Sequence, residues 1–503
     1  MTGTETTALT ATHTTVREPA EFPAVVPDDP RWRRLWERVT WPEAIAGFVI
    51  VTACVAFVIT QLQPSQVLRN TTPAGGDMGA HVWLPDFVKR SLLPHLRVTG
   101  WTPDWYDGFP ALTYYFPGPI VGIALLSYIL PYNIAFKLVT VVGLIALPVA
   151  AWAFGRLARM RFPGAAILAV GTLPYLFGRD YTIYGGNIAS TMAGEFAFSI
   201  GLALALVFLG VVARGLENGR HRALAAVLLA AVGVSHILPL LFAVLGAIIL
   251  TVMRFDRHRL KWVLPVLLAG GALIAFWALP FELRLPYATD MGYEKVTQYT
   301  STLFPAKDAW LFVLAALGAV MSMVRRNRIG VFLAVMAVLS AAIFRFAPQY
   351  RLWNARVLPF WYLCLYLLAA VAFLEIGLSI VDAVRSYQRS RASVAGTIGV
   401  AGVTLVVALS WVNFPLHNLP FGHTTSSGKY DWLGITTSDV SYIPDWVYWN
   451  YSGYQSPSKA RRAEYFALVN EMKKLGQDPA FGCGRAMWEY EPELDQMGTP
   501  DAL

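Results

Sequence analysis

An aspartate and a histidine stand four residues apart in a polar, aromatic-rich segment that extends from Gly75 to Phe116. The aspartate, Asp77, follows two glycines, and His81 would share its face if the segment is helical. A carboxylate in this setting could act as a general base that takes a proton from a hydroxyl group, while the histidine orients a substrate or hydrogen-bonds a phosphate. The simpler alternative is that Asp77 caps the N-terminus of a short helix. The two roles are compatible.

A second acid, Glu195, ends a run of small residues that begins at Gly185 and directly precedes an apolar segment. Close packing of helix backbones would account for the small residues, but it does not account for an acid at the membrane edge. Glu195 is therefore a candidate second acid or ligand of an acceptor hydroxyl, and Asn187 in the same run is a candidate substrate-binding residue. His236 lies at the turn between two apolar runs, where it either caps a helix end or contacts a phosphate.

Two arginines, Arg351 and Arg356, lie where basic residues are unexpected. They follow an apolar segment on the side that the loop charges identify as extracytoplasmic, where basic residues are normally depleted. A lipid phosphate is a natural partner, because a guanidinium matches phosphate oxygens with two parallel hydrogen bonds. The alternative is that both side chains reach ordinary lipid headgroups. Asn354, between them, is a further candidate for substrate binding.

Aromatic residues are concentrated in the same polar segment as Asp77. Trp105, together with Trp101 and the sequence Tyr-Tyr-Phe at 114–116, is typical of an aromatic belt at a membrane surface. Sugar rings also stack on such side chains, so that Trp105 is a candidate substrate-binding residue. Asp107 precedes a glycine and is interpreted as a turn residue and not as a second catalytic carboxylate.

The composition identifies an integral membrane protein. Of the 503 residues, 56% are hydrophobic and only 14% are charged, whereas soluble proteins carry about 25% charged residues. The formal net charge is +8, but the basic residues fall in short clusters between apolar runs, so that nucleic-acid binding is not expected. The three cysteines are far apart in the sequence, which leaves neither a disulfide framework nor a cysteine metal site.

The apolar runs predict an all-α polytopic fold with about eleven transmembrane helices, the first of which has about the ~20 residues needed to cross a bilayer. They lie at 44–62, 134–154, 163–177, 196–212, 223–236, 238–253, 262–279, 310–324, 330–344, 358–380 and 395–412. The basic clusters place a disordered tail, 1–40, in the cytoplasm and the first loop, 63–133, outside it.

The regions that flank the helices follow from the same charge pattern. Within the first loop, the run at 117–132 begins and ends near prolines and is predicted to be a re-entrant or interfacial helix. If it crossed the membrane, the later basic loops would all lie outside, against the usual bias. The transmembrane domain then spans 41–412, and residues 413–503 form a partial extracytoplasmic region. We expect that the chain is a truncation of a longer protein.

These features resemble the GT-C class of membrane glycosyltransferases, which use polyprenyl-phosphate sugars. More narrowly, short motifs at 75–81, 105–110, 115–117, 352–356 and 487–490 are similar to those of a bacterial membrane family labelled "6-pyruvoyl-tetrahydropterin synthase-related". That label carries no pterin chemistry here, because the sequence has no cluster like the zinc-binding histidines of the soluble synthase. The resemblance implies a GT-C-like fold, with Asp77 in the position of the first-loop catalytic acid. Arg356 matches only loosely the residue that contacts the donor phosphate.

The expected function is inverting transfer of a sugar from a polyprenyl-phosphate donor to a glycan or glycolipid acceptor, at the extracytoplasmic face of a bacterial plasma membrane. Asp77 would activate the acceptor hydroxyl, and Arg351 or Arg356 would neutralise the departing phosphate. No metal or other cofactor is expected to be required, because the leaving group is a lipid phosphomonoester. The alternatives are a lipid-linked sugar transporter and an inactive membrane scaffold. A composition typical of GC-rich bacterial genomes makes arabinose and mannose plausible sugars.

Overall fold

Long apolar helices make up most of this chain, as the composition predicts. The computed structural model describes residues 41–103, 108–179, 181–288, 293–348, 352–388, 419–436, 442–454, 456–457 and 459–481. These residues belong to one unit, which spans Thr40–Leu503. The predicted N-terminal tail, 1–40, and the last predicted span, 395–412, lie outside the described residues.

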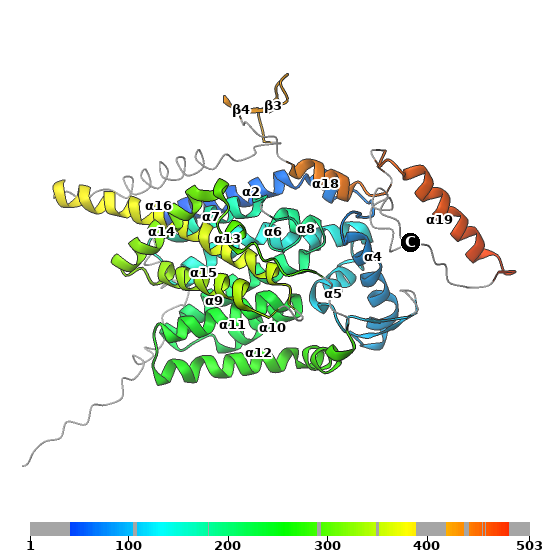
Figure 1. The fold of residues 1–503 in the computed structure, drawn as a ribbon, viewed down its shortest axis with the longest axis horizontal. Coiled ribbons are helices and arrows are strands. Elements are labelled where there is room, and N and C mark those ends of the chain that lie inside the picture. The colour runs from blue at the N-terminus through cyan, green and yellow to red at the C-terminus, as the bar shows by residue number, and fades with distance from the viewer. Residues whose placement is uncertain are drawn as a thin grey trace, which may run out of the picture. The chain divides into compact units, whose positions relative to one another are not determined.

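Seven of the described helices are long and apolar enough to cross a membrane, which supports a mostly helical membrane protein. They are α2 (Trp41–Gln61), α6 (Tyr132–Leu157), α9 (Phe196–Asn218), α12 (Arg257–Arg284), α14 (Ala309–Val324) with α13 (Tyr299–Leu303) and η4 (Ala306–Asp308) before it, α15 (Arg328–Phe346) and α16 (Leu358–Gln388). Each coincides with a predicted span, and Figure 1 shows them running side by side.

Three further predicted spans form shorter apolar helices. They are α7 (Gly164–Phe177), α10 (Arg222–Ser235) and α11 (Ile237–Val252), with 14, 14 and 16 residues. At about 1.5 Å per residue they are about 21–24 Å long, which is less than the roughly 30 Å of bilayer hydrocarbon. The structure therefore has seven helices of full length and three short ones in the part of the chain where the sequence predicted ten crossings.

Among the seven long spans, α9 and α16 are the most deeply packed, since 83% and 78% of their apolar windows are buried. Helix α6 lies along α9, and α14 lies along α16. Small residues permit this approach, because a Cβ at Gly143 would lie 2.5 Å from the backbone of Ser199, and one at Gly318 would lie 2.1 Å from the carbonyl oxygen of Leu368. The residues just before α9 and α16 are therefore held at fixed positions.

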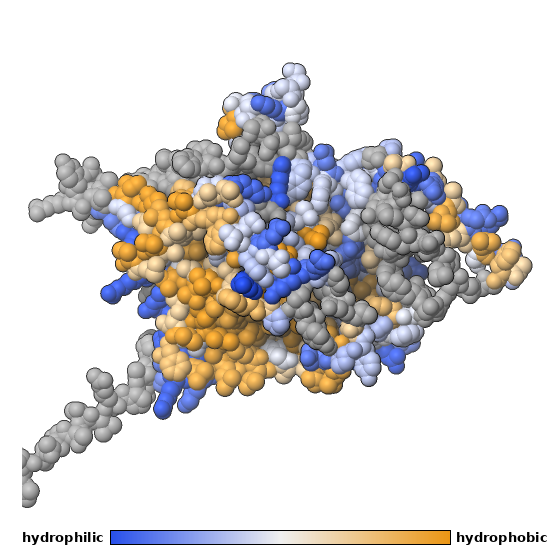
Figure 2. All heavy atoms as spheres, viewed as in Figure 1, coloured by the Kyte–Doolittle hydropathy of each residue, from blue (hydrophilic) through white to orange (hydrophobic). Residues whose placement is uncertain are grey.

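Apolar side chains also cover the outside of the helices. Figure 2 shows a broad orange face, with blue residues mainly toward its edges. On α12, the side chains of Leu268, Leu273 and Phe276 are 64%, 51% and 58% exposed. Large contiguous apolar surfaces of this kind are unfavourable in water and typical of contact with lipid.

Short elements gather at one end of the helices (Figure 1). They are α3 (Pro64–Val67), α4 (Met78–Phe87), η1 (Val88–Leu92), η2 (Leu93–His95), strands β1 (Gly100–Thr102) and β2 (Phe109–Ala111), α5 (Pro117–Leu126), α8 (Ile188–Met192), η3 (Leu285–Tyr287) and η5 (Asn354–Val357). Strands β1 and β2 form an antiparallel hairpin in which Trp101 lies opposite Pro110. The predicted interfacial run at 117–132 begins as α5, whose ten residues are too few to cross a bilayer.

The C-terminal part contributes a helix to the same end. Helix α18 (Ile443–Tyr451) packs against α3 and α8. The remaining described elements are α19 (Arg462–Gln477) and a small antiparallel sheet of β3 (Gly422–Thr424), β4 (Tyr430–Trp432) and β5 (Ile435–Thr436), in which β4 is central.

Candidate functional site

Asp77 is held against the backbone of the segment that precedes α9. Its N–H donates a 2.9 Å hydrogen bond to the carbonyl oxygen of Ala193. This approach requires glycine on both strands of the contact, because a Cβ at Gly76 would lie 2.5 Å from that oxygen and a Cβ at Gly194 would lie 2.7 Å from the Cβ of Asp77. Asp77 directly precedes α4, but its side chain makes no capping hydrogen bond. The simple capping interpretation is therefore not realised.

The loop before Asp77 is also held from its other side by α18. The N–H of Ala74 donates a 2.9 Å hydrogen bond to the carbonyl oxygen of Asn450. The hydroxyl of Thr71 donates a 2.5 Å hydrogen bond to the carbonyl oxygen of Tyr451. Asp77 thus lies on a loop that is fixed between the start of α9 and a helix from the far end of the chain.

Glu195 and Arg356 form an ion pair between the residues that precede α9 and α16. The carboxylate oxygen Oε1 contacts the guanidinium nitrogen Nη1, and the two side chains are 14% and 11% exposed. Burial raises the pKa of Glu195, the positive charge of Arg356 opposes this rise, and the negative charge of Asp77 adds to it. Asp77 and Arg356 therefore both act electrostatically on the carboxylate of Glu195.

Tyr115 lies within the same cluster of charges. Burial raises its pKa well above the ordinary value, the negative charges of Glu195 and Asp77 raise it further, and Arg356 lowers it. Its hydroxyl oxygen is 3.3 Å from Nε2 of His81. The Tyr115 hydroxyl is consequently a neutral hydrogen-bond donor at the edge of the ion pair.

His81 is a neutral residue in this arrangement. Its ring lies 4.7 Å from that of Tyr115 and meets Phe196 edge to face at 5.5 Å. Burial lowers its pKa to about 4, so that the imidazole carries no charge near pH 7. His81 can therefore exchange hydrogen bonds with a substrate, but it does not supply a positive charge to a phosphate.

His236 takes the helix-end role that was one of its two sequence interpretations. It separates α10 from α11, and its Nδ1 accepts a 3.2 Å hydrogen bond from the N–H of Leu238. An accepting Nδ1 places the proton of the neutral ring on Nε2, which is then a donor. The ring lies 4.1 Å from that of Phe116 and 5.1 Å from that of Phe198. The contact with a phosphate stays a prediction.

The two candidate asparagines have structural roles. Asn187 caps α8 by accepting a 2.8 Å hydrogen bond from the N–H of Ser190, and its Nδ2 donates to the carbonyl oxygens of Gly178 and Tyr181 at 3.0 Å each. Because Asn187 is fully buried, its amide shapes the segment that leads to Glu195 and is already occupied by these bonds.

Asn354 is engaged in the same way. Its Nδ2 donates to the carbonyl oxygens of Val296 and Phe344, at 2.9 and 3.1 Å, and its Oδ1 accepts from the N–H of Val296 at 3.1 Å. Beside it, Trp353 stacks on Tyr293 at 4.4 Å. These contacts fix the turn that delivers Arg356, so that Asn354 positions the arginine whether or not it also contacts a substrate.

Two sequence candidates cannot be placed. Trp105 and Arg351 lie outside the described residues, and their proposed roles stay predictions. The structure instead adds Tyr115, which the sequence analysis placed in an aromatic belt and in the motif at 115–117 but did not single out as a site residue. The signal that could have found it is that motif, which ends at the proline that starts α5.

In the part of the chain that the structure describes, no group of three or more His, Cys, Asp or Glu side chains is arranged to hold a metal ion. A cavity of about 320 Å³ is present, but it is lined by Glu217, Glu375 and several arginines at the opposite ends of α9 and α16. It is not part of the Asp77 cluster. No protein-family model and no curated protein matches this sequence.

Proposed function

We propose that this chain is a GT-C-type glycosyltransferase, which transfers a sugar with inversion from a polyprenyl-phosphate donor to a glycan or glycolipid acceptor. The proposal depends above all on the convergence of Asp77, Glu195 and Arg356 at one end of the helices, from three segments that are far apart in the sequence. A carboxylate and a cation at the level of the lipid headgroups provide the two functions that sugar transfer from a lipid phosphate needs.

In this mechanism the acceptor oxygen attacks the anomeric carbon as its proton passes to the carboxylate of Asp77. The bond between the anomeric carbon and the phosphate oxygen breaks, and polyprenyl phosphate leaves with its electron pair. Asp77 suits the role of base because the residue is exposed to solvent, while its backbone N–H is bonded to the carbonyl oxygen of Ala193. A backbone held from both sides keeps the carboxylate in position, and misplacement by about 1 Å can cost about 100-fold in rate.

Arg356 would neutralise the leaving phosphate, and Glu195 would orient the guanidinium of Arg356. The ion pair uses Nη1 of the guanidinium, and a guanidinium carries further donors on Nη2 and Nε that suit phosphate oxygens. A paired arginine also avoids the cost of a buried lone charge before the donor arrives. Neutral His81 and the hydroxyl of Tyr115 would bind sugar hydroxyls in the same region.

The test is transfer of labelled arabinose or mannose from polyprenyl phosphate by membranes that contain the Asp77→Asn variant. Replacing the base should lower transfer by about 100-fold or more, while the retained amide keeps the shape of the loop, so that donor binding persists. The matched control is Asp86→Asn on α4, because the Asp86 carboxylate pairs at 3.0 Å with Arg90, whose side chain is 76% exposed. Such pairs contribute little.

Full transfer by the Asp77→Asn variant would overturn the assignment of the base. If the unchanged protein moves the intact lipid-linked sugar across the membrane without forming a product, the chain is a transporter, and Asp77→Asn should have little effect on that movement. The site is proposed to face the extracytoplasmic side of a bacterial plasma membrane, which a membrane-impermeant acceptor added to one side of oriented vesicles would test.

A further inference from the structure

Helix ends opposite to Asp77 enclose a second polar site. A cavity of about 320 Å³ lies between the ends of α6, α9, α11 and α14, the start of α15 and one face of α16. Its charged lining consists of two glutamates, Glu217 and Glu375, and six arginines: Arg159, Arg161, Arg254, Arg325, Arg326 and Arg328. The lining therefore has a large excess of positive charge.

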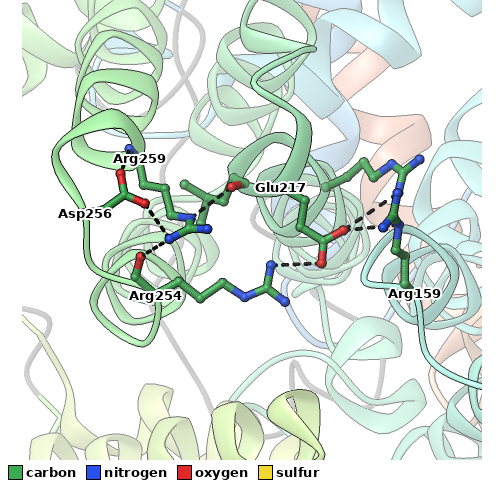
Figure 3. Close-up of polar contacts among 7 residues, drawn as sticks. Arg159, Glu217, Arg254, Asp256 and Arg259 are labelled. Atoms are coloured by element: carbon green, nitrogen blue, oxygen red, sulfur yellow. Dashed lines mark hydrogen bonds and ion pairs between the residues drawn. The ribbon is translucent and has the colours of Figure 1, made fainter. Parts of the chain in front are cut away.

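Both glutamates already have partners. Figure 3 shows Glu217 among arginines, with its carboxylate 2.8 Å from Nη1 of Arg254, 3.2 Å from Nε of Arg159 and 3.7 Å from Nη1 of Arg214, which does not line the cavity. Glu375, whose side chain is only 4% exposed, lies 2.7 Å from Nε of Arg325. These pairs use three of the six arginines and leave the other three without a carboxylate of the lining to neutralise them.

The other three arginines supply the unbalanced charge. Within the part of the chain that the structure describes, the side chains of Arg161, Arg326 and Arg328 make no ion pair or hydrogen bond, and all three are exposed to solvent. Cations that line one cavity repel one another unless an anion lies between them. A guanidinium is also the side chain that best matches the oxygens of a phosphate.

Two of the lining arginines lie in left-handed turns that end helices. Arg159 and Arg326 follow the ends of α6 and α14 with φ angles of 60° and 57°. After each of them, the next N–H closes the helix end, Met160 to the carbonyl oxygen of Gly155 at 2.9 Å and Asn327 to that of Ser322 at 2.8 Å. Glycine is the residue that normally occupies this left-handed position. These two turns fix where the backbones of Arg159 and Arg326 lie at the edge of the cavity.

Apolar residues adjoin the arginines at the outer edge of the helices. Val252 near Arg254 is 61% exposed, and Val324 next to Arg325 is 77% exposed. Phe255 is 67% exposed. A ligand with a phosphate and hydrocarbon chains would satisfy both the cavity and this apolar surface, and basic pockets between membrane helices are known to hold lipid headgroups.

We propose that this cavity binds the phosphate of an anionic phospholipid headgroup. The phosphate lies among Arg161, Arg326 and Arg328, and the acyl chains lie along the exposed apolar surface of the neighbouring helices. The site is separate from the Asp77 cluster and does not depend on the sugar-transfer proposal. A soluble phosphate has the same headgroup chemistry, so that the test must distinguish the two sources.

The test compares lipid binding to the purified full-length protein by native mass spectrometry, with phosphatidylglycerol, phosphatidylcholine and inorganic phosphate as probes. The cavity variant is Arg161→Gln with Arg328→Gln. The control variant is Arg222→Gln with Arg257→Gln, which removes two exposed arginines from the same end of the helices that do not line the cavity. A third variant, Arg161→Lys with Arg328→Lys, keeps the charge.

The unchanged protein and the control variant should bind phosphatidylglycerol with similar affinity, and the cavity variant should bind it about tenfold or more weakly. The lysine variant should regain part of the affinity. Inorganic phosphate that binds with the same arginine dependence, in the absence of a preference for phosphatidylglycerol, would assign the cavity to a soluble phosphate and overturn the lipid source. Equal losses in the cavity and control variants, or no binding to the unchanged protein, would overturn the site.

Discussion

The sharpest consequence of the loop geometry concerns Gly76, which has a φ of 49° and brings the backbone against Ala193. We predict that Gly76→Ala displaces Asp77 without unfolding the helices. The new Cβ would lie 2.5 Å from the carbonyl oxygen of Ala193, and the backbone of Ala193 cannot move away easily because it lies between α8 and the buried start of α9. Gly76 and Asp77 are themselves exposed, so that they are the part that is displaced.

The free-energy cost of Gly76→Ala follows from two contributions. A left-handed conformation costs a residue with a Cβ roughly 1–2 kcal/mol, and inserting a carbon into a filled site costs about 1–3 kcal/mol. Their total is comparable to the roughly 2.7 kcal/mol that corresponds to a 100-fold change in rate. If the loop relaxes by about 1 Å, the Asp77 carboxylate leaves its position and transfer should fall by about 100-fold.

The assay measures sugar transfer and thermal unfolding of the same preparations. The matched control is Gly122→Ala in α5, where an added Cβ meets no atom within 4 Å and the substitution should be neutral or slightly stabilising. Gly76→Ala should lower transfer strongly and Tm by only a few degrees. Transfer within about threefold of the unchanged protein, or an equal loss in Gly122→Ala, would refute the view that this contact positions Asp77.

Two further predictions concern the groups around the ion pair. Arg356→Lys should reduce the kcat/KM for the polyprenyl-phosphate donor by about 10- to 100-fold, because an ammonium cannot contact both Glu195 and a phosphate with a rigid fork. The control, Arg345→Lys at the end of α15, should have little effect. An equal loss in both variants would contradict the role of Arg356. The second concerns stability in acid. The pKa of His81 falls from 6.5 to about 4 on folding, so that the unfolded chain binds more protons between these values, and stability should decrease by up to about 3 kcal/mol as the pH falls from 6.5 to 4. His81→Asn should flatten that pH dependence of Tm, and an unchanged dependence would show that His81 is not buried as described.

The sequence predicted the helices well because hydrophobic length is a strong local signal. Ten predicted spans coincide with described helices, and the run at 117–132 begins as α5, which has only ten residues. The interfacial position of α5 stays a prediction. The runs predicted at 163–177, 223–236 and 238–253 were already short, and helices α7, α10 and α11 have closely similar lengths. Hydrophobic length alone does not tell whether a run this short crosses a bilayer.

The contacts between distant segments could not be read from the sequence. Asp77 was a sound candidate from its glycine neighbours, but its hydrogen bond to Ala193 joins residues that are 116 positions apart. The position of α18 against the same loop joins still more distant parts of the chain. Asn187 illustrates the opposite case, because a polar residue among small ones predicts a binding role as readily as the buried helix cap that the structure describes.

Helix α9 connects the two polar sites. Glu195 and Glu217 stand 22 residues apart at its two ends, each paired with arginine, and a helix of this length spans about 33 Å. That distance is close to the roughly 30 Å thickness of bilayer hydrocarbon, so that an α9 perpendicular to the membrane would hold one ion pair near each headgroup layer, and a vertical shift would pull one of them into hydrocarbon. Because Asp77 is bonded to Ala193, two residues before Glu195, it lies at the same end of α9 as the Glu195–Arg356 pair. In the proposed transfer, a lipid-linked phosphate would reach this end of α9 from its own leaflet.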